Sequence, residues 1–216
     1  MMTMTELDLT ERMASFICHE LAGSATALSH GIEFLKQQGG GAAKDAEALL
    51  AFSADQLNDR LRVARLAFGT GLARASDARG EVQAVLGTLF AGGPAKLRWE
   101  LDQPARADDG ATPSPQVLKA VLNLAIIGHG LLARGGVLTI GRTLLPGGLG
   151  LTVTAAGQRL LDGPAHLDWL VTPGQRGGEV RTAQVEFTRA VARASGHVLS
   201  MTRAPGQIIF TVSPPG

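Results

Sequence analysis

The sequence predicts an α+β protein in which a long helical hairpin precedes an α/β sandwich. Residues 5–38 and 42–75 carry apolar side chains at alternating steps of three and four, the spacing of one face of a helix. Beyond them, short helical and strand patterns alternate between turns rich in Gly and Pro. We therefore place a hairpin domain at residues 1–77 and a sandwich domain at residues 78–216.

The hairpin is expected to hold two long helices joined by a tight Gly linker. The first helix is about 50 Å long at about 1.5 Å rise per residue, and Gly39-Gly40-Gly41 stops it and lets the chain reverse. The two apolar stripes contain Met13, Ile17, Leu21, Ala25, Leu28, Ile32 and Leu35, and Leu50, Ala54, Leu57, Leu61, Ala64 and Phe68. Since a lone hairpin covers both stripes poorly, we expect two copies to form a dimeric four-helix bundle.

The sandwich domain is expected to place its helices on one face of a sheet. Predicted helices span 82–90, 115–133 and 179–195, and predicted strands span 96–101, 137–142, 149–155, 198–203 and 207–212. A charged, Pro-containing loop covers 102–115, and a second loop rich in Gly and Pro covers 162–178.

Composition and charge exclude several classes of protein. Lys and Arg number 20 against 19 Asp and Glu, so no excess of positive charge exists to neutralise a nucleic-acid backbone. A single cysteine excludes an internal disulfide and any multi-cysteine metal site. The first twelve residues do not resemble a signal peptide, and the longest apolar stretch, 121–133, is too short to span a bilayer. We expect a cytoplasmic protein without membrane or nucleic-acid partners.

His19 is the strongest candidate for chemistry. It lies on the first helix, beside the apolar stripe and not within it. Its helical face also carries Arg12, Phe16, Gly23, Thr26 and His30. Gly23 and Ser24 are small, so a partner could approach the imidazole closely, and Glu20 can accept its proton or orient it. The alternative is a histidine that merely packs at the edge of a helix interface.

The other histidines and the cysteine carry weaker signals. His30 shares the face of His19 but lies about 16 Å away along the helix, so we expect it to be solvated or to face a partner. The remaining three histidines have no carboxylate or cysteine at metal-ligand spacing, and we expect no metal site. Cys18 directly precedes His19, so the two side chains diverge by about 100° and form no dyad. We interpret Cys18 as a small buried apolar residue.

Two groups of motifs identify a family resemblance. Cys-His-Glu-Leu at 18–21, followed by Gly-Ile-Glu-Phe-Leu at 31–35, resembles the first helix of the ChpT-like histidine phosphotransferases. Leu-Asn-Leu at 122–124 and Leu-Ala-Arg-Gly-Gly-Val-Leu-Thr at 132–139 are similar to motifs of that family's second domain. The resemblance covers nearly the whole chain in the same order. Three positions depart from the pattern, with Ser24 replacing a Pro, His30 an Asn and Phe16 a frequent Arg.

The resemblance implies that the sandwich is a degenerate histidine kinase ATP-binding domain. Asn123 matches one Asn of the kinase pattern, but Ile127 stands where the Mg²⁺-binding Asn belongs. Ala155 stands where an Asp binds adenine, and Arg-Thr-Ala-Gln at 181–184 replaces the Gly-rich phosphate turn. We therefore expect no ATP and no cofactor in this chain.

The resemblance also implies the activity. A histidine phosphotransfer protein of a multistep phosphorelay would accept a phosphoryl group on His19 from one receiver-domain aspartate and pass it to another, with Mg²⁺ supplied by the receiver. Glu20 would orient the imidazole and handle its proton. The residues expected to contact receivers are Phe16, Gly23, Ser24, Thr26, Ala27, His30, Leu49 and Phe52. Two alternatives remain: an ATP-dependent histidine kinase core with a divergent nucleotide site, and a non-enzymatic scaffold that binds receivers.

Overall fold

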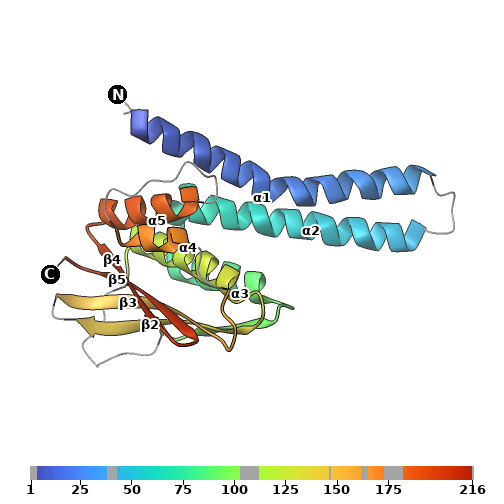
Figure 1. The fold of residues 1–216 in the computed structure, drawn as a ribbon. Helices are drawn as coiled ribbons and strands as arrows, with labels where there is room; N and C mark the ends of the chain where they lie inside the picture. The colour runs from blue at the N-terminus through green and yellow to red at the C-terminus, as the bar shows by residue number, and fades with distance from the viewer. Residues whose placement is uncertain are drawn as a thin grey trace.

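A computed structural model shows the hairpin projecting from a compact second part of the chain (Figure 1). The structure describes residues 4–37, 43–102, 112–145, 147–161, 165–172 and 182–215. Helix α1, Met4–Gln37, runs antiparallel to helix α2, Ala43–Ala67, and the two helices lie side by side along their length (Figure 1). The predicted α+β class and its hairpin are thus confirmed. The predicted linker falls outside the described residues.

The second long helix ends earlier than the sequence predicts. The apolar spacing extends to residue 75, but α2 ends at Ala67 and a short 3-10 helix, η1, occupies Leu72–Arg74. Gly69 and Gly71 lie between them and approach the carbonyl oxygen of Arg65, where a Cβ atom would lie within 3.0 Å of that oxygen. The chain turns here because these two positions lack side chains.

The second part of the chain is a five-stranded sheet covered by helices. Its elements are α3 (Ala78–Phe90), β1 (Ala95–Trp99), α4 (Pro115–Leu131), β2 (Gly136–Leu145), β3 (Gly148–Ala156), η2 (Ala165–Leu170), α5 (Ala183–Ala194), β4 (Val198–Ala204) and β5 (Gln207–Ser213). The strand order is β1-β2-β3-β5-β4, with β1 parallel to β2 and the other pairs antiparallel. Helices α3, α4 and α5 pack on one face, between the sheet and the hairpin (Figure 1).

Local sequence signals explain where these helices begin. Asp77 accepts a hydrogen bond from the backbone N–H of Gly80 at 2.8 Å, and so caps α3. Ser114 accepts from the backbone N–H of Val117 at 3.3 Å, with Pro115 at the first position of α4. The predicted loop at 162–178 in fact contains η2, a correction to the sequence prediction. Residues 179–181, predicted to be helical, fall outside the described residues.

The core of the molecule lies between the sheet and its helices. Alternate residues of the strands point into it and are fully buried, among them Leu138, Ile140, Val153, Ala155 and Phe210. Leu66, Ala67 and Leu72, at the end of the hairpin, belong to the same buried cluster. The base of the hairpin is therefore packed into the second part of the chain, whereas its tip projects beyond it.

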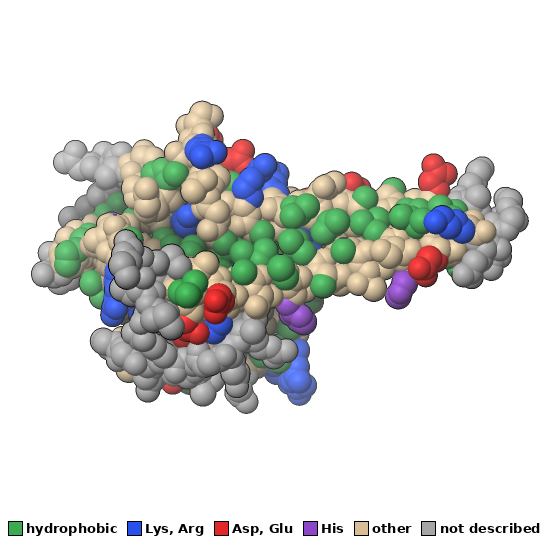
Figure 2. All heavy atoms as spheres, turned by 90° about the horizontal axis from the view of Figure 1, so that it is seen from above, with side chains coloured by type: hydrophobic (Ala, Val, Ile, Leu, Met, Phe, Trp, Pro, Cys, Tyr) green, Lys and Arg blue, Asp and Glu red, His purple; other side chains and the backbone are tan. Residues whose placement is uncertain are grey.

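The hairpin itself leaves apolar side chains uncovered. Ile32 of α1 is 46% exposed and Leu61 of α2 is 45% exposed, although both belong to the predicted stripes. Figure 2 shows hydrophobic side chains running along the hairpin, with histidine side chains at its edge. The exposed stripes agree with the expectation of a dimeric bundle, which stays a prediction because the structure contains one chain.

Candidate functional site

His19 lies on the exposed surface of α1, about halfway along the helix. Within the described ranges, no side chain makes a hydrogen bond to its imidazole. Glu20 is also exposed, and the structure records no contact between its carboxylate and His19. The imidazole is therefore open to a partner, and the orienting role of Glu20 stays a prediction.

The packing of α1 on α2 divides the hairpin into two faces. Gly31 lies against Leu50 of α2, where a Cβ atom on Gly31 would lie 2.6 Å from Leu50 Cδ2. At about 100° per residue, His19 lies about 120° to one side of Gly31, and Ile32 lies about 100° to the other. Gly23, Thr26, Ala27 and His30, all exposed, lie on the same side as His19. We call these residues and His19 the histidine face.

The opposite side of the hairpin is its apolar face, which we define by Leu21, Leu28 and Ile32 of α1 and Leu61 of α2. Ser53 is buried and marks the side of α2 that faces α1. Leu61 is rotated from Ser53 by about 80° around the axis of α2, toward the apolar face. Leu21 and Leu28 are partly exposed. The sequence-predicted dimer stripe and the sequence-predicted histidine are therefore on opposite sides of the hairpin, so dimer formation through the apolar face would leave His19 accessible.

Phe52 and Leu49 of α2 project from the same side of the hairpin as His19. Phe52 lies about 100° from the buried Ser53, in the sense opposite to Leu61. The two side chains are 60% and 55% exposed, and Phe34 of α1, 44% exposed, lies beside them on this side. We call Phe34, Leu49 and Phe52, on the described parts of α1 and α2 nearest the linker, the tip patch. Phe34 lies about 22 Å from His19 along the axis of α1.

Two of the predicted contact residues lie inside the molecule. Ser24 is only 6% exposed and faces the interior of the hairpin. Phe16 is half-buried, and its ring contacts Phe68 edge-on at 5.6 Å between centroids, while Phe68 contacts Phe187 of α5 at 5.8 Å. Both residues thus pack within the chain. Cys18, predicted to be buried, is in fact exposed, because the side of α1 that it occupies is uncovered in a single chain.

Arg60 is a residue near His19 that sequence reasoning missed. Its Nη1 donates a 2.7 Å hydrogen bond across the hairpin to the backbone carbonyl of Glu20, the residue that follows His19. The contact joins α2 to α1 at the level of the candidate site. Nothing in the spacing of the sequence indicated it, because the pairing of the two helices depends on the position of the linker.

A buried ion pair fixes α1 against the second part of the chain. Arg12 is 8% exposed, and its Nη1 and Nη2 donate to Glu186 Oε1 and Oε2 on α5 at 3.2 and 2.7 Å. Arg12 also donates to Thr182 Oγ1 at 3.3 Å and to Asp8 Oδ2 at 2.9 Å. The hydrogen bond to Glu186 raises the pKa of Arg12. Arg12, which forms this bidentate ion pair, lies about two helical turns before His19.

The positions matched to nucleotide ligands in kinases serve the fold in this chain. Asn123 is fully buried, and its Nδ2 donates to the carbonyls of Ala67 at 2.8 Å and Lys119 at 3.0 Å. Asn123 therefore ties α4 to the end of α2. Ala155 is buried in the core of the sheet, and Ile127 is partly buried against the core. Residues 173–181, which include part of the predicted loop at 162–178, fall outside the described residues.

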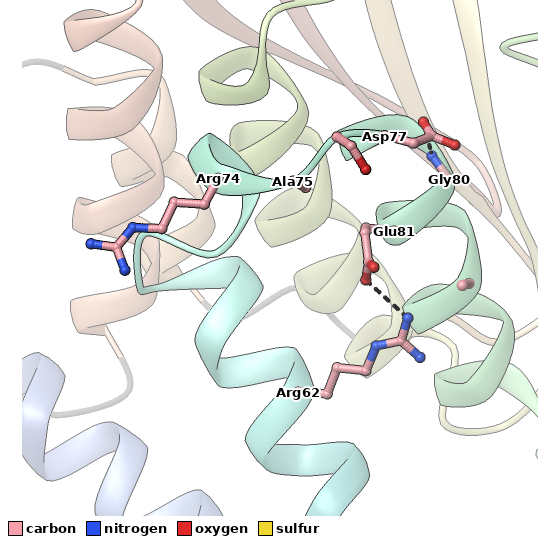
Figure 3. Close-up of a pocket in the computed structure, with 8 residues that line it drawn as sticks. Arg62, Arg74, Ala75, Asp77, Gly80 and Glu81 are labelled. Carbon is pink, nitrogen blue, oxygen red and sulfur yellow. Dashed lines mark hydrogen bonds and ion pairs between the residues drawn. The ribbon is translucent and has the colours of Figure 1, made fainter.

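A polar pocket of about 360 Å³ lies where the hairpin meets α3. Figure 3 shows Arg62 of α2 and Glu81 of α3 pointing toward one another, and they form a 2.9 Å ion pair. Asp77 caps α3, and Arg74 points away from this pair (Figure 3). The charges in the pocket thus join the two parts of the molecule, and the pocket lacks the exposed imidazole that the site chemistry requires.

Two absences limit the chemistry of the described residues. The described residues contain no group of three potential metal ligands close together. None of their helices has the length and apolar character that crossing a membrane requires. Among the described residues of α1, the exposed groups that could react are the imidazoles of His19 and His30 and the thiol of Cys18.

Comparisons with known proteins identify relatives over nearly the whole chain. The family model for the histidine phosphotransferase C-terminal domain matches residues 79–206. Over 213 residues, and 97% of each chain, the sequence is 30% identical to the protein phosphotransferase ChpT of Brucella abortus (strain 2308). The solved structure of a bacterial phosphotransferase matches with a TM-score of 0.77 and 27% identity, covering 98% of each chain. Through the domain match and the match along nearly its whole length, the chain belongs to the ChpT-like family of histidine phosphotransferases.

Proposed function

We propose that His19 carries a phosphoryl group between receiver-domain aspartates of a phosphorelay. The observation that carries the proposal is an exposed imidazole on an open helix face, in a chain of the histidine phosphotransferase family. A nitrogen of His19 attacks the phosphorus of a phospho-aspartate. The new N–P bond forms as the P–O bond breaks, and the aspartate leaves as a carboxylate. Both phosphorylated species are of high energy, so the transfer runs in either direction without ATP.

The second reactant supplies the metal in this mechanism. A receiver's own Mg²⁺ neutralises charge on the transferring phosphoryl group when the two proteins meet. This chain then has to present the imidazole, exclude water and hold the receiver in line. Glu20 would take up the imidazole proton or orient the ring once the receiver is bound.

The histidine face and the tip patch form the proposed docking surface. Gly23, Thr26 and Ala27 leave room for close approach beside His19. Leu49 and Phe52 add exposed apolar area toward the hairpin tip. Apolar anchors surrounded by polar residues are typical of protein interfaces. The receiver would therefore rest on both helices, with its aspartate over His19.

We further propose that the chain does not phosphorylate itself. A kinase has to bring bound ATP to its histidine, whereas Arg12, Glu186 and the Phe16–Phe68–Phe187 stack hold α5 against α1. Asn123, at a position of the kinase nucleotide pattern, is committed to two backbone carbonyls. The same proposal includes a homodimer formed through the apolar face and a cytoplasmic location, where receivers are found.

The test is phosphotransfer to wild-type protein and to His19→Ala. Phosphorylated receiver domains are mixed with each protein, and acid-labile, base-stable phosphate is followed. We expect label on the wild type, none on His19→Ala, and normal label on the control His197→Ala, which removes a histidine between α5 and β4, outside the proposed docking surface. Label appearing with Mg·ATP alone would support the kinase alternative. Receiver binding without label, equal in wild type and His19→Ala, would support the scaffold.

A further inference from the structure

We propose that Arg60 is the cation that stabilises the phosphoryl group on His19. The inference rests on the proposed function and assigns a role to a residue of α2 that the transfer chemistry has not yet used. A phosphohistidine carries negative charge that no group of the described histidine face on α1 itself neutralises. The nearest cation must therefore come from the neighbouring helix.

The geometry places Arg60 at the level of His19. The Nη1 atom of Arg60 is 2.7 Å from the carbonyl oxygen of Glu20, which is adjacent to His19 in the chain. Around the axis of α2, Arg60 is rotated by about 20° from the buried Ser53, toward the histidine face. Around the axis of α1, Glu20 is rotated by about 20° from Gly31, toward the same face. The guanidinium therefore lies in the groove between the helices on the side from which the imidazole projects.

The charge of Arg60 is not neutralised by a carboxylate in the described part of the chain. Arg12 and Arg62, the other arginines of the hairpin with long-range contacts, pair with Glu186 and Glu81. Arg60 instead bonds to a neutral peptide carbonyl, and it is exposed. A guanidinium has five N–H donors, so Arg60 retains donors for a second acceptor. Its position and its charge both suit an anion that arrives on His19.

Arg60 would act when the phosphoryl group is transferred to His19, by balancing the negative charge that the group brings. When the N–P bond to His19 forms, the phosphoryl oxygens bring negative charge to the histidine face. Arg60 moves no proton and stays a cation. It keeps its hydrogen bond to the Glu20 carbonyl and donates its remaining N–H groups to the phosphoryl oxygens, where both donor and acceptor are charged. These added bonds favour phospho-His19 over the free imidazole.

The test uses potassium phosphoramidate, a small phosphoryl donor that needs no receiver. Its N–P bond breaks as the His19 N–P bond forms, and ammonia leaves with the imidazole proton. The full-length wild type, Arg60→Met, Arg60→Lys and the control Arg134→Met are labelled under identical conditions. Arg134 is an exposed cation in the turn after α4, so its loss changes net charge without changing the groove. Label at His19 is the difference from His19→Ala.

We expect Arg60→Met to lower the rate of labelling at His19 by about tenfold, as the loss of one charge-assisted hydrogen bond implies. Arg60→Lys should retain part of the rate, and Arg134→Met all of it. The ³¹P resonance of phospho-His19 should move in Arg60→Met and stay in place in Arg134→Met. A purely structural Arg60 would lower the melting temperature of both free and phosphorylated protein and leave that resonance unchanged, which would overturn the proposal.

The proposed function fails separately from this inference. If phosphoramidate labels His19 but no phosphorylated receiver does, the relay is wrong and the Arg60 comparison still decides the role of Arg60. If receivers label His19 normally in Arg60→Met and the phosphoramidate rates are equal, the relay stands and Arg60 has no part in it.

Discussion

The hairpin and the second part of the chain differ in where they leave apolar side chains exposed. In the second part, the sheet and helices α3, α4 and α5 close over a continuous buried cluster, and the exposed Leu144, Leu161 and Val198 lie in a loop or near strand ends. In the hairpin, five large apolar side chains away from the first turns are 44–60% exposed: Ile32, Phe34, Leu49, Phe52 and Leu61. A single chain would gain nothing from this exposure. The difference agrees with the proposal that the hairpin binds a second copy and receiver domains, while the second part supports it.

The same contrast divides the hairpin along its length. Its base is tied to α5 by Arg12 and Glu186 and by an aromatic stack, and its end at Leu66 enters the common core. As far as the structure describes it, the outer part of the hairpin projects beyond the second part of the chain (Figure 1). His19 lies between the tied base and the open tip, so the rigid support ends where the proposed docking surface begins. The predictions below test this division, in order of decreasing effect.

Breaking the buried ion pair should cause the largest loss of stability. Arg12→Met removes a buried guanidinium that donates two hydrogen bonds to Glu186, and we expect the free energy of unfolding to fall by about 3 kcal/mol. The comparison is Arg62→Met, whose ion pair with Glu81 has side chains 38% and 40% exposed, and which should cost at most about 1 kcal/mol. Denaturant unfolding of both variants at one protein concentration measures the difference.

A double variant separates the ion pair from the packing around it. Arg12→Met with Glu186→Leu removes both charges and should recover most of the lost stability. If the double variant is as unstable as Arg12→Met alone, the base of the hairpin is held by shape and not by charge compensation.

Charges placed on the two faces of the hairpin should have different consequences. Leu61→Glu puts a carboxylate on the apolar face, and we expect dimer dissociation to cost about 2 kcal/mol less, because an apolar contact is lost. Phe52→Glu changes the tip patch and should leave the dimer intact while weakening receiver binding. Light scattering with receiver titration distinguishes them. Equal oligomeric states for both variants would contradict the division into two faces.

Gly23→Ala should strengthen the helix and weaken its proposed function. A Cβ atom at Gly23 meets nothing within 4 Å in one chain, and Ala is favoured over Gly in a helix by about 1 kcal/mol. We therefore expect a small gain in thermal stability. The added methyl would stand on the histidine face where a receiver approaches, so phosphotransfer should slow. Unchanged transfer with raised stability would show that the receiver does not approach closely at Gly23.

Elements with a long apolar pattern were predicted correctly from the sequence. Elements that depend on a few residues, or on contacts between residues far apart in the chain, were missed. The bounds of α1 agree with the prediction because its apolar stripe, from Met13 to Leu35, repeats over about six turns. The end of α2 was wrong because apolar spacing continued to Phe68, while Gly69 and Gly71 decided the turn. The 3-10 helix η2 has six residues, too few for a period to appear. Short elements are fixed by packing, which spacing alone does not contain.

The candidate site shows the same limit. His19 was found because it stands in a motif and beside an apolar stripe. The burial of Ser24 was missed because the sequence does not show which side of α1 faces α2. The contacts of Arg12 with Glu186 join residues 174 positions apart, and that of Arg60 with Glu20 joins residues 40 apart. Such pairs appear only when the chain is folded.

The smallest expected effect concerns a histidine of the closed part. His129 contacts Phe90 edge-on at 4.6 Å, and burial lowers its pKa from the ordinary 6.5. Below pH 6.5 the unfolded chain therefore binds a proton at His129 more readily than the folded chain does. Folding stability supplied by neutral His129 is present above that pH and is lost as pH falls through the folded pKa. His129→Leu should lessen the fall in stability between pH 7 and pH 5, measured by denaturant unfolding. The exposed His30, replaced by Leu, should leave the pH dependence as it is, and an equal slope in both variants would mean that burial of His129 has no energetic consequence.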